Sequence, residues 1–353
     1  MPSRIGVFAA TFGIAAVLLP FVKRAGLRLG LIDQPGALKI HSTPTPRLGG
    51  VAIFAAMLIA LSFTEGAAFR SAWPFFAALA MIWAAGLADD VYRASAALRL
   101  TVEVAAAAVL WYGGWRIPLP GIGAMGLALQ CLCVVFVVNA FNFLDGSDGV
   151  AAGVGATIAA GYLVVPGGYL SSLGTACAWS LLGACIAFLV FNFPPATIFM
   201  GDAGSTAIGF CIAFLALDLY RAQPALHSTV IFPLVAGGLP FLDAVLAVLR
   251  RLRRGASPFH GDRRHFYDLL LARRWGARSV ALACWGINAA FVTLGVLSVR
   301  SDAAWATWLS AVALAGFCVL VVCLGSLSSP EAGAEETRVK ILGAAAGERS
   351  RRI

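Results

Sequence analysis

The chain has 353 residues, of which 60% are hydrophobic and 12% are charged, and its formal net charge is +9. Soluble globular proteins carry about 25% charged residues, so this sequence has too few charged side chains to cover soluble domains. The same numbers exclude a disordered chain, a collagen and a disulfide-rich secreted scaffold, and they predict a protein that crosses a membrane several times.

Eleven runs of mostly apolar residues follow one another along the chain. A helix needs about 20 such residues to cross the hydrocarbon core, and continuous rather than alternating apolarity favours helices over a transmembrane barrel. We therefore predict an all-α bundle of about 11 transmembrane helices over residues 1–325 and a disordered tail over 326–353; because the second and eighth runs are short, a count of ten stays open. The runs are 5–22, 49–64, 72–88, 98–113, 122–141, 149–165, 172–191, 204–218, 227–249, 280–298 and 304–324.

The basic residues predict the orientation of this bundle. The loops at 23–47, 89–99 and 250–278 and the C-terminal tail carry 21 Lys and Arg in total, whereas the opposite side carries 5. Because basic loops stay in the cytoplasm, we expect the N-terminus outside and the C-terminus inside the cell. A nucleic-acid partner is not expected, since no basic, aromatic-rich soluble domain is present to bind one.

Five acidic residues lie where the predicted spans reach the cytoplasmic face. Carboxylates that converge on one face repel one another unless a positive group lies among them, and a divalent metal beside a substrate phosphate supplies that charge. We therefore predict an anionic, metal-dependent site at this face. The five residues are Asp89, Asp90, Asp145, Asp148 and Asp202.

The first two acidic clusters also have simpler interpretations, which for the second is a plain loop. Asp89-Asp90 equally fits a polar helix end at the membrane interface. The residues of the second cluster recur every third position, with glycine after each aspartate, which places them on one side of a helix end or in a tight turn and does not fit an EF-hand. In the third cluster, glycines flank Asp202 and expose amides at the start of the next helix, an arrangement that favours an anion. The second cluster comprises Asn139, Asn142, Asp145 and Asp148.

The last basic loop contains His260 and His265, two of the four histidines. A zinc site would need further ligands, and the loop contains no cysteine. We expect these histidines to bind an anionic substrate together with Arg264. Residues 265–275 are expected to form an amphipathic helix on the membrane surface, with Phe266, Leu269 and Leu270 directed toward the bilayer.

A secondary membrane transporter is the main alternative from another class. Such proteins place ionisable groups on broken helices near the bilayer midplane, and Glu103, Asp243 and the Gly237-Gly238-Leu-Pro240 segment meet that description. The five acids at one face favour an enzyme instead, and a purely structural scaffold leaves them unexplained.

Taken together, the motifs resemble those of the polyprenyl-phosphate N-acetylhexosamine-1-phosphate transferases, in family order and over about residues 1–325. The His260–His265 loop matches more loosely. The matching stretches are Pro44-Thr-Pro46-Arg47-Leu-Gly49-Gly50, Asp89-Asp90, Asn142-x-x-Asp145-Gly-x-Asp148-Gly, Phe191-Asn192 and Phe199-Met200-Gly201-Asp202-x-Gly204-Ser205.

The resemblance implies an activity. A UDP-N-acetylhexosamine would donate its sugar-1-phosphate to undecaprenyl or another polyprenyl phosphate, and UMP would be released. N-acetylglucosamine is the favoured sugar. Mg²⁺, or alternatively Mn²⁺, is the expected cofactor. This step would start lipid-linked cell-wall or surface-polysaccharide synthesis at the cytoplasmic face of a bacterial inner membrane, and a homodimer is compatible with it. The branch that uses UDP-MurNAc-pentapeptide carries a His-rich last loop, whereas His260-Gly-Asp-Arg-Arg-His265 is closer to the simple-sugar branch.

The resemblance also implies roles for single residues. Asp202 and Asp148 are expected to bind the metal, and Asp89, Asp90 and Asp148 are the expected catalytic residues. The second pKa of a phosphate is about 6, so positioning and charge stabilisation are expected to outweigh base catalysis near pH 7. The expected substrate-binding residues are Asn142, Asp145, Asn192, Arg93, His260, Arg264, His265 and Arg47, of which Arg47 fits a plain positive-inside residue equally well.

Overall fold

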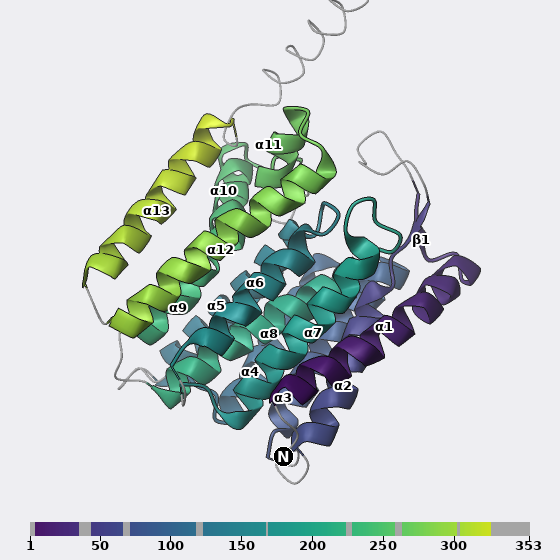
Figure 1. Cartoon of the computed structure of the whole chain (residues 1–353), viewed down its shortest axis with the longest axis horizontal. Coiled ribbons are helices and arrows are strands. Elements are labelled where there is room, and N and C mark those ends of the chain that lie inside the picture. Colours follow the sequence, from purple (N-terminus) through teal and green to yellow (C-terminus); the bar gives the residue numbers. More distant parts are fainter. Residues whose placement is uncertain are drawn as a thin grey trace, which may run out of the picture.

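The structure is a computed structural model of the chain. It describes residues 4–34, 44–65, 71–117, 123–166, 169–223, 228–257, 263–301 and 304–325. These residues form thirteen helices and one two-stranded ribbon (Figure 1), so the predicted all-α class is confirmed. The predicted disordered tail, 326–353, lies outside the described residues.

The helices follow the predicted apolar runs closely. Their bounds are α1 (Arg4–Arg28), α2 (Gly49–Glu65), α3 (Trp73–Tyr92), α4 (Ala96–Tyr112), α5 (Gly123–Leu144), α6 (Val150–Val164), α7 (Ser172–Asn192), α8 (Gly201–Ala222), α9 (Ser228–Ala236), α10 (Gly238–Arg253), α11 (Phe266–Ala272), α12 (Ala277–Ser301) and α13 (Ala304–Cys323). The ninth run forms two helices, α9 and α10, which are bent by 70° at the Gly237–Pro240 segment.

Six of these helices are long and apolar enough to cross a membrane, and the bent pair α9–α10 raises the number to seven among the described residues. The six are α1, α3, α5, α7, α8 and α12. The apolar segments of α2, α6 and α13 are shorter. A multi-pass membrane protein is therefore supported, while the count of eleven spans and the orientation of the termini stay predictions.

Helix α8 lies at the centre of the bundle. Its most apolar stretch is 89% buried, and it packs against α2, α3, α5 and α7. Small residues allow these helices to approach closely: Gly50 of α2 lies against Gly204, and Gly86 of α3 lies against the backbone of Asp202 and Ala203. The close contacts bring the ends of α2, α3 and α8 together.

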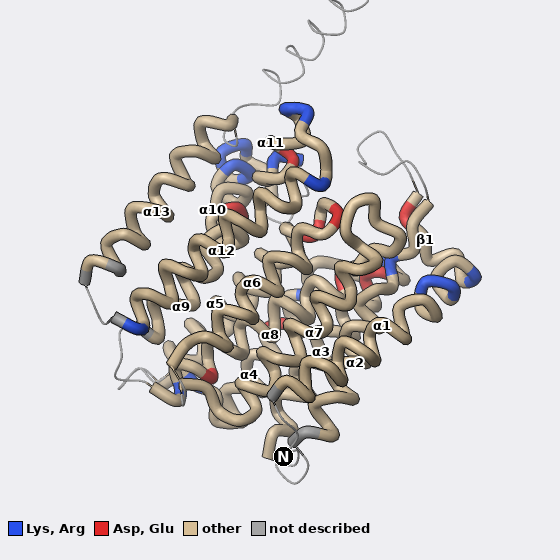
Figure 2. Tube along the Cα trace, viewed as in Figure 1, with Lys and Arg blue, Asp and Glu red and all other residues tan. Residues whose placement is uncertain are grey.

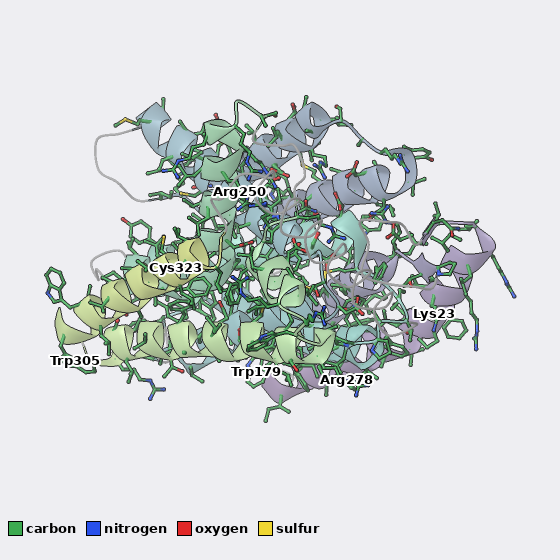
Figure 3. The ribbon with its side chains drawn as sticks, turned by 90° about the horizontal axis from the view of Figure 1, so that it is seen from above. Lys23, Trp179, Arg250, Arg278, Trp305 and Cys323 are labelled. Carbon is green, nitrogen blue, oxygen red and sulfur yellow. The ribbon has the colours of Figure 1, made fainter. Side chains whose placement is uncertain are left out.

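Charged residues gather at one end of the bundle, near α10, α11 and β1, and the middles of the helices carry few of them (Figure 2). We call this the charged end; it contains the junctions α3–α4, α5–α6 and α7–α8. The sequence places Arg250 and Arg251 in the loop that follows the ninth run, and the structure corrects this. Both lie in the last turn of α10 and are buried, and Arg250 lies inside the molecule when it is seen from above (Figure 3).

The ribbon at the charged end ties two sequence motifs together. β1 (Ile32–Asp33) pairs antiparallel with β2 (Thr45–Pro46). The Phe199 amide donates to the Pro46 carbonyl at 2.7 Å, and the Gly49 and Gly50 amides donate to the carbonyls of Phe199 and Met200 at 2.9 and 2.8 Å. The Pro44–Gly50 motif therefore runs beside the segment that leads into α8.

Candidate active site

Two carboxylates and one guanidinium form the centre of the candidate site. Asp89 lies in the last turn of α3, and Asp202 lies in the first turn of α8. Arg99 of α4 donates to Asp89 Oδ2 at 2.9 Å and also to Asp202 Oδ2. The three side chains are 20–22% exposed, so a ligand from outside can reach them. Arg99 is the positive group that converging carboxylates require.

Asp90, the neighbour of Asp89, is directed to a different partner. Its two carboxylate oxygens accept the backbone N–H groups of Asp202 at 2.9 Å and Ala203 at 3.0 Å, and its side chain is 1% exposed. Negative charge is favourable at a helix N-terminus, so Asp90 itself is the anion at the exposed amides of α8. The structure thus gives Asp90 a positioning task, and its catalytic role stays a prediction.

The loop between α5 and α6 is fastened to the loop between α7 and α8. Asn192 accepts the Gly149 amide at 2.8 Å and donates to the Ile198 carbonyl at 2.9 Å. Asp148 accepts the Ala196 amide at 2.9 Å. Both predicted ligand-binding residues thus hold the loops together, and Asn192 is nearly buried.

Two further residues of the same motif face the start of α8. Asn142 donates to Ser205 Oγ at 3.2 Å. Burial raises the pKa of Asp145 well above its usual value, and the nearby carboxylates of Asp202 and Asp90 raise it further. The second and third acidic clusters of the sequence therefore meet at one place.

Arg99 and Glu103 form a polar stripe on α4 that sequence reasoning missed. Glu103 is buried and accepts Asn139 Nδ2 at 2.6 Å. Residues four apart on a helix lie on one face, so Arg99 and Glu103 point to the same side. The sequence analysis uses Arg99 only to predict the orientation of the bundle. Its spacing of four residues from Glu103, an acid within an apolar run, is the signal that indicates a shared polar site.

The three basic or histidine positions at the edge of the site differ in their surroundings. Arg47 lies 3.9 Å from both Asp33 Oδ1 and Asp90 Oδ1, next to the α8 start. Arg93 ends α3 in the left-handed conformation, with φ 54°, and is exposed; within the described part of the chain no hydrogen bond or ion pair is found for its side chain. His260 lies outside the described residues.

Helix α11 confirms the predicted short helix but not its contact with the bilayer. Phe266, Leu269 and Leu270 are buried, and Phe266 packs edge-on against Phe317 of α13. The apolar face of α11 is therefore covered by the protein instead of lipid: α11 packs against α12, and Phe266 also meets α13. Tyr267 donates to the Phe143 carbonyl at 3.2 Å, which places α11 above the end of α5.

His265 is fixed at the start of α11. Its Nδ1 lies 2.6 Å from Asp243 Oδ2 of α10, and the Phe266 amide donates to the other Asp243 oxygen at 2.8 Å. The histidine and the aspartate are both nearly buried. Arg264 donates to the Gly325 carbonyl at 3.4 Å. The structure thus gives His265 and Arg264 each a partner in the protein, and the His265 ring lies beside Phe143 at the end of α5.

The carboxylate pair has the donor atoms to hold a magnesium ion. Within the described ranges, no three His, Cys, Asp or Glu side chains surround one ion position. Mg²⁺ commonly takes one or two protein carboxylates and completes its coordination with water and substrate phosphate oxygens. Asp89 and Asp202, held together by Arg99 and partly open, provide such oxygen donors.

Comparisons with known proteins agree with the sequence motifs. The profile of glycosyl transferase family 4 matches residues 72–220. A decaprenyl-phosphate N-acetylglucosaminephosphotransferase of Mycobacterium tuberculosis is 32% identical, with 89% of each chain covered. A probable undecaprenyl-phosphate N-acetylglucosaminyl 1-phosphate transferase of Bacillus subtilis is 30% identical, with 82% of this chain and 83% of the relative covered. An undecaprenyl-phosphate alpha-N-acetylglucosaminyl 1-phosphate transferase of Escherichia coli K12 is 26% identical, with 82% of each covered.

Proposed function

The chain belongs to glycosyl transferase family 4, and we propose that it transfers N-acetylglucosamine-1-phosphate from UDP-N-acetylglucosamine to a polyprenyl phosphate in the bilayer. An oxygen of the lipid phosphate attacks the phosphorus that carries the sugar. The bond from that phosphorus to the bridging oxygen breaks, and UMP leaves. The observation that carries this proposal is the Asp89–Arg99–Asp202 cluster, which is partly exposed at the charged end of an apolar bundle.

Asp89 and Asp202 are the residues that would hold Mg²⁺. When bound, the ion supplies positive charge that neutralises the diphosphate and the leaving phosphate. Asp148, the second predicted metal ligand, offers its carboxylate from the neighbouring loop, where one oxygen accepts the Ala196 amide. Mn²⁺ satisfies the same oxygen donors.

Arg99 and Arg47 supply the fixed positive charge of the site. A guanidinium carries five N–H donors, so Arg99 retains donors for a phosphate beyond its contacts to Asp89 and Asp202. Arg47 lies at the α8 start, next to Asp90. Bringing two anionic substrates together is costly without such groups, and a fixed arrangement of charge costs no reorganisation during the reaction.

The carboxylates act by positioning in this scheme. A phosphate with a second pKa of about 6 is mostly deprotonated near pH 7, so the attacking lipid phosphate has little proton to lose. Asp90 and the Gly49–Gly50 backbone fix the first turn of α8, and thereby the Asp202 carboxylate. Asn142, Asp145, Asn192, His265 and Arg264 form or support the walls on the nucleotide side.

The proposed setting is the inner membrane of a bacterium, with the charged end in the cytoplasm, where UDP-sugars are made. The relatives' names favour a simple N-acetylglucosamine donor over UDP-MurNAc-pentapeptide. A secondary transporter is not favoured, because the two acids within spans have partners inside the protein: Glu103 pairs with Asn139, and Asp243 pairs with His265.

The test uses purified protein in detergent with polyprenyl phosphate, Mg²⁺ and a panel of UDP-sugars, and it measures UMP. We expect UMP from UDP-N-acetylglucosamine, and we expect EDTA to remove it. UMP from a different UDP-N-acetylhexosamine alone would keep the reaction and change the donor. Folded protein that releases no UMP from any donor contradicts the proposal.

A further inference from the structure

A groove of about 450 Å³ opens between α6 and α12. Its volume lies within the range of about 300–1,000 Å³ that is usual for ligand sites. Thr157, Gly161 and Val164 contribute one wall, and Ala289 and Thr293 contribute the other. Arg300 stands at one end of the groove, where its guanidinium donates to the Val164 carbonyl at 2.7 Å.

This groove lies far from the candidate active site. Helix α6 begins beside Asp148 and ends at Val164, and its 15 residues correspond to roughly 22 Å at 1.5 Å per residue. The groove therefore belongs to the half of the bundle opposite the charged end, and the transferase site does not account for it.

Two tryptophans indicate the depth of Arg300 in the membrane. Trp305 and Trp308, in the first turns of α13, are 55% and 72% exposed, and Trp305 lies at the outer edge of the molecule (Figure 3). Exposed tryptophans in membrane helices gather at the level of the lipid head groups. Since α13 follows α12 directly, the exposed guanidinium of Arg300 lies near the same level.

The length of the groove matches one leaflet. From Ala289 to Arg300, α12 rises by roughly 17 Å, and half of the hydrocarbon core measures about 15 Å. The side chains along this length are mostly apolar, including Ala160, Val292 and Val296. A chain of methylene groups that starts at Arg300 would thus remain in the groove to the middle of the membrane.

We propose that the groove binds one acyl chain of an anionic phospholipid, whose phosphate pairs with Arg300. Arg300 retains N–H donors beyond its bond to Val164, and a lipid phosphate is the anion present at this depth. A polyprenyl phosphate bound here would place its phosphate at the end of the bundle away from Asp89 and Asp202, so it would not be in position to react. The proposed lipid is therefore a structural ligand and not a substrate.

Native mass spectrometry of the purified chain tests the proposal. Phosphatidylglycerol, phosphatidylcholine and polyprenyl phosphate are added separately at equal concentration. We expect a retained phosphatidylglycerol adduct, and we expect Arg300→Ala to weaken it roughly fivefold, the effect of one cation at a lipid surface. Arg300→Lys should retain most of the binding, and Ala289→Phe, which fills the groove, should remove it.

The matched control is Arg116→Ala. Arg116 is another exposed arginine beyond the end of a helix, and it donates to the Trp111 carbonyl at 2.9 Å, but it does not line the groove; its loss should leave the adduct unchanged. Thermal unfolding checks that each variant is folded. If Arg300→Ala does not fold, the binding measured for Arg300→Lys and Ala289→Phe tests the proposal. Equal binding of phosphatidylcholine, an adduct that persists in Ala289→Phe, or displacement by polyprenyl phosphate would each overturn the proposal.

Discussion

Two aspartates of helix α8 have contrasting surroundings, and the contrast separates function from stability. Asp202 is partly exposed and pairs with Arg99, whereas Asp218 is buried and accepts Trp115 Nε1 and the amide and hydroxyl of Ser171. We expect Asp202→Asn to lower UMP release by roughly 10²–10³ and to leave the unfolding temperature nearly unchanged. Asp218→Asn should cost about 1–3 kcal/mol and retain turnover once folded. An Asp202→Asn enzyme with most of its turnover contradicts the assigned metal ligand.

Asp89 and Asp90 are adjacent in sequence, and the structure predicts different effects for the same substitution. Asp90→Asn replaces one acceptor oxygen at the start of α8 by an NH₂ group, so an amide loses its partner, at a cost of about 1–3 kcal/mol. Asp89→Asn alters a partly exposed contact to Arg99 and one of the two carboxylates proposed to hold Mg²⁺, so it should reduce turnover with little effect on stability. Thermal unfolding in detergent measures both variants, and equal unfolding temperatures would show that Asp90 does not cap α8.

At the scale of single residues, the sequence predicted which residues lie close together, but not which hydrogen bonds each of them makes. Asp89, Asn142, Asp145 and Asp202 converge as expected. The hydrogen bonds of Asp90 and Asn192 could not be predicted from the sequence. Their partners are backbone amides and carbonyls that lie far away along the chain, or in loops whose course the residue pattern does not define. Backbone groups look alike in every sequence, so such bonds leave no signal there.

At the scale of elements, the contact between α3 and α8 sets the spacing of the site. A Cβ on Gly86 would lie 2.6 Å from the Asp202 carbonyl oxygen. This oxygen belongs to the helix backbone, which cannot move aside as a flexible side chain can. We expect Gly86→Ala to separate the helices, to lower the free energy of unfolding by about 1–3 kcal/mol and to reduce UMP release, because Asp89 moves away from Asp202. Gly13→Ala on α1, where a Cβ meets nothing within 4 Å, is the control and should be neutral or slightly stabilising.

Helix α11 gives a prediction for the dependence of stability on pH. Burial raises the pKa of Asp268 from 3.8 to about 6, although Arg263 and His265 lower it. Because the folded pKa lies above the unfolded one, Asp268 favours folding fully below pH 4, and this contribution is lost as the pH rises through 6, by up to about 3 kcal/mol.

The pH-dependent contribution of Asp268 is tested by measuring the unfolding of the native chain and of Asp268→Asn between pH 4 and 8. The native chain should lose stability relative to the variant from about pH 4 to 6, and the difference should be constant above about pH 7. Subtracting the variant removes the contribution of other groups, including Asp145. A difference that does not change with pH would mean that α11 leaves Asp268 in contact with water.

Sequence patterns predicted the helices well because burial in lipid or protein demands long apolar runs. The break at Gly237 also followed from glycine and proline chemistry. The buried face of α11 did not follow from the pattern, since an amphipathic segment such as Phe266–Ala272 has the same periodicity whether lipid or protein covers it. The β1–β2 ribbon was missed because two-residue strands carry no periodicity.

At the scale of the whole molecule, the fold separates two tasks along the bundle. The charged end collects the carboxylates, Arg99 and α11, whereas the opposite half contains few Lys, Arg, Asp or Glu residues (Figure 2). A lipid phosphate and a water-soluble nucleotide sugar can meet only at a boundary between membrane and water. The junctions α3–α4, α5–α6 and α7–α8 all turn at this end, which explains why acidic residues of different loops share one site.

This polarity predicts which end faces the cytoplasm. Helix α4 runs from the charged end to the opposite end, where Arg116 is exposed, and Arg254 is exposed after α10 at the charged end. The test uses a background in which the exposed Cys133 and Cys323 are replaced by serine. We expect a membrane-impermeant maleimide to label Arg116→Cys in intact cells. We expect the same reagent to label Arg254→Cys only after permeabilisation, because basic loops stay inside. Labelling of both after permeabilisation controls for accessibility. The reverse pattern in intact cells would place the Asp89–Arg99–Asp202 cluster outside, away from the UDP-sugar, and would contradict the orientation and the proposed reaction together.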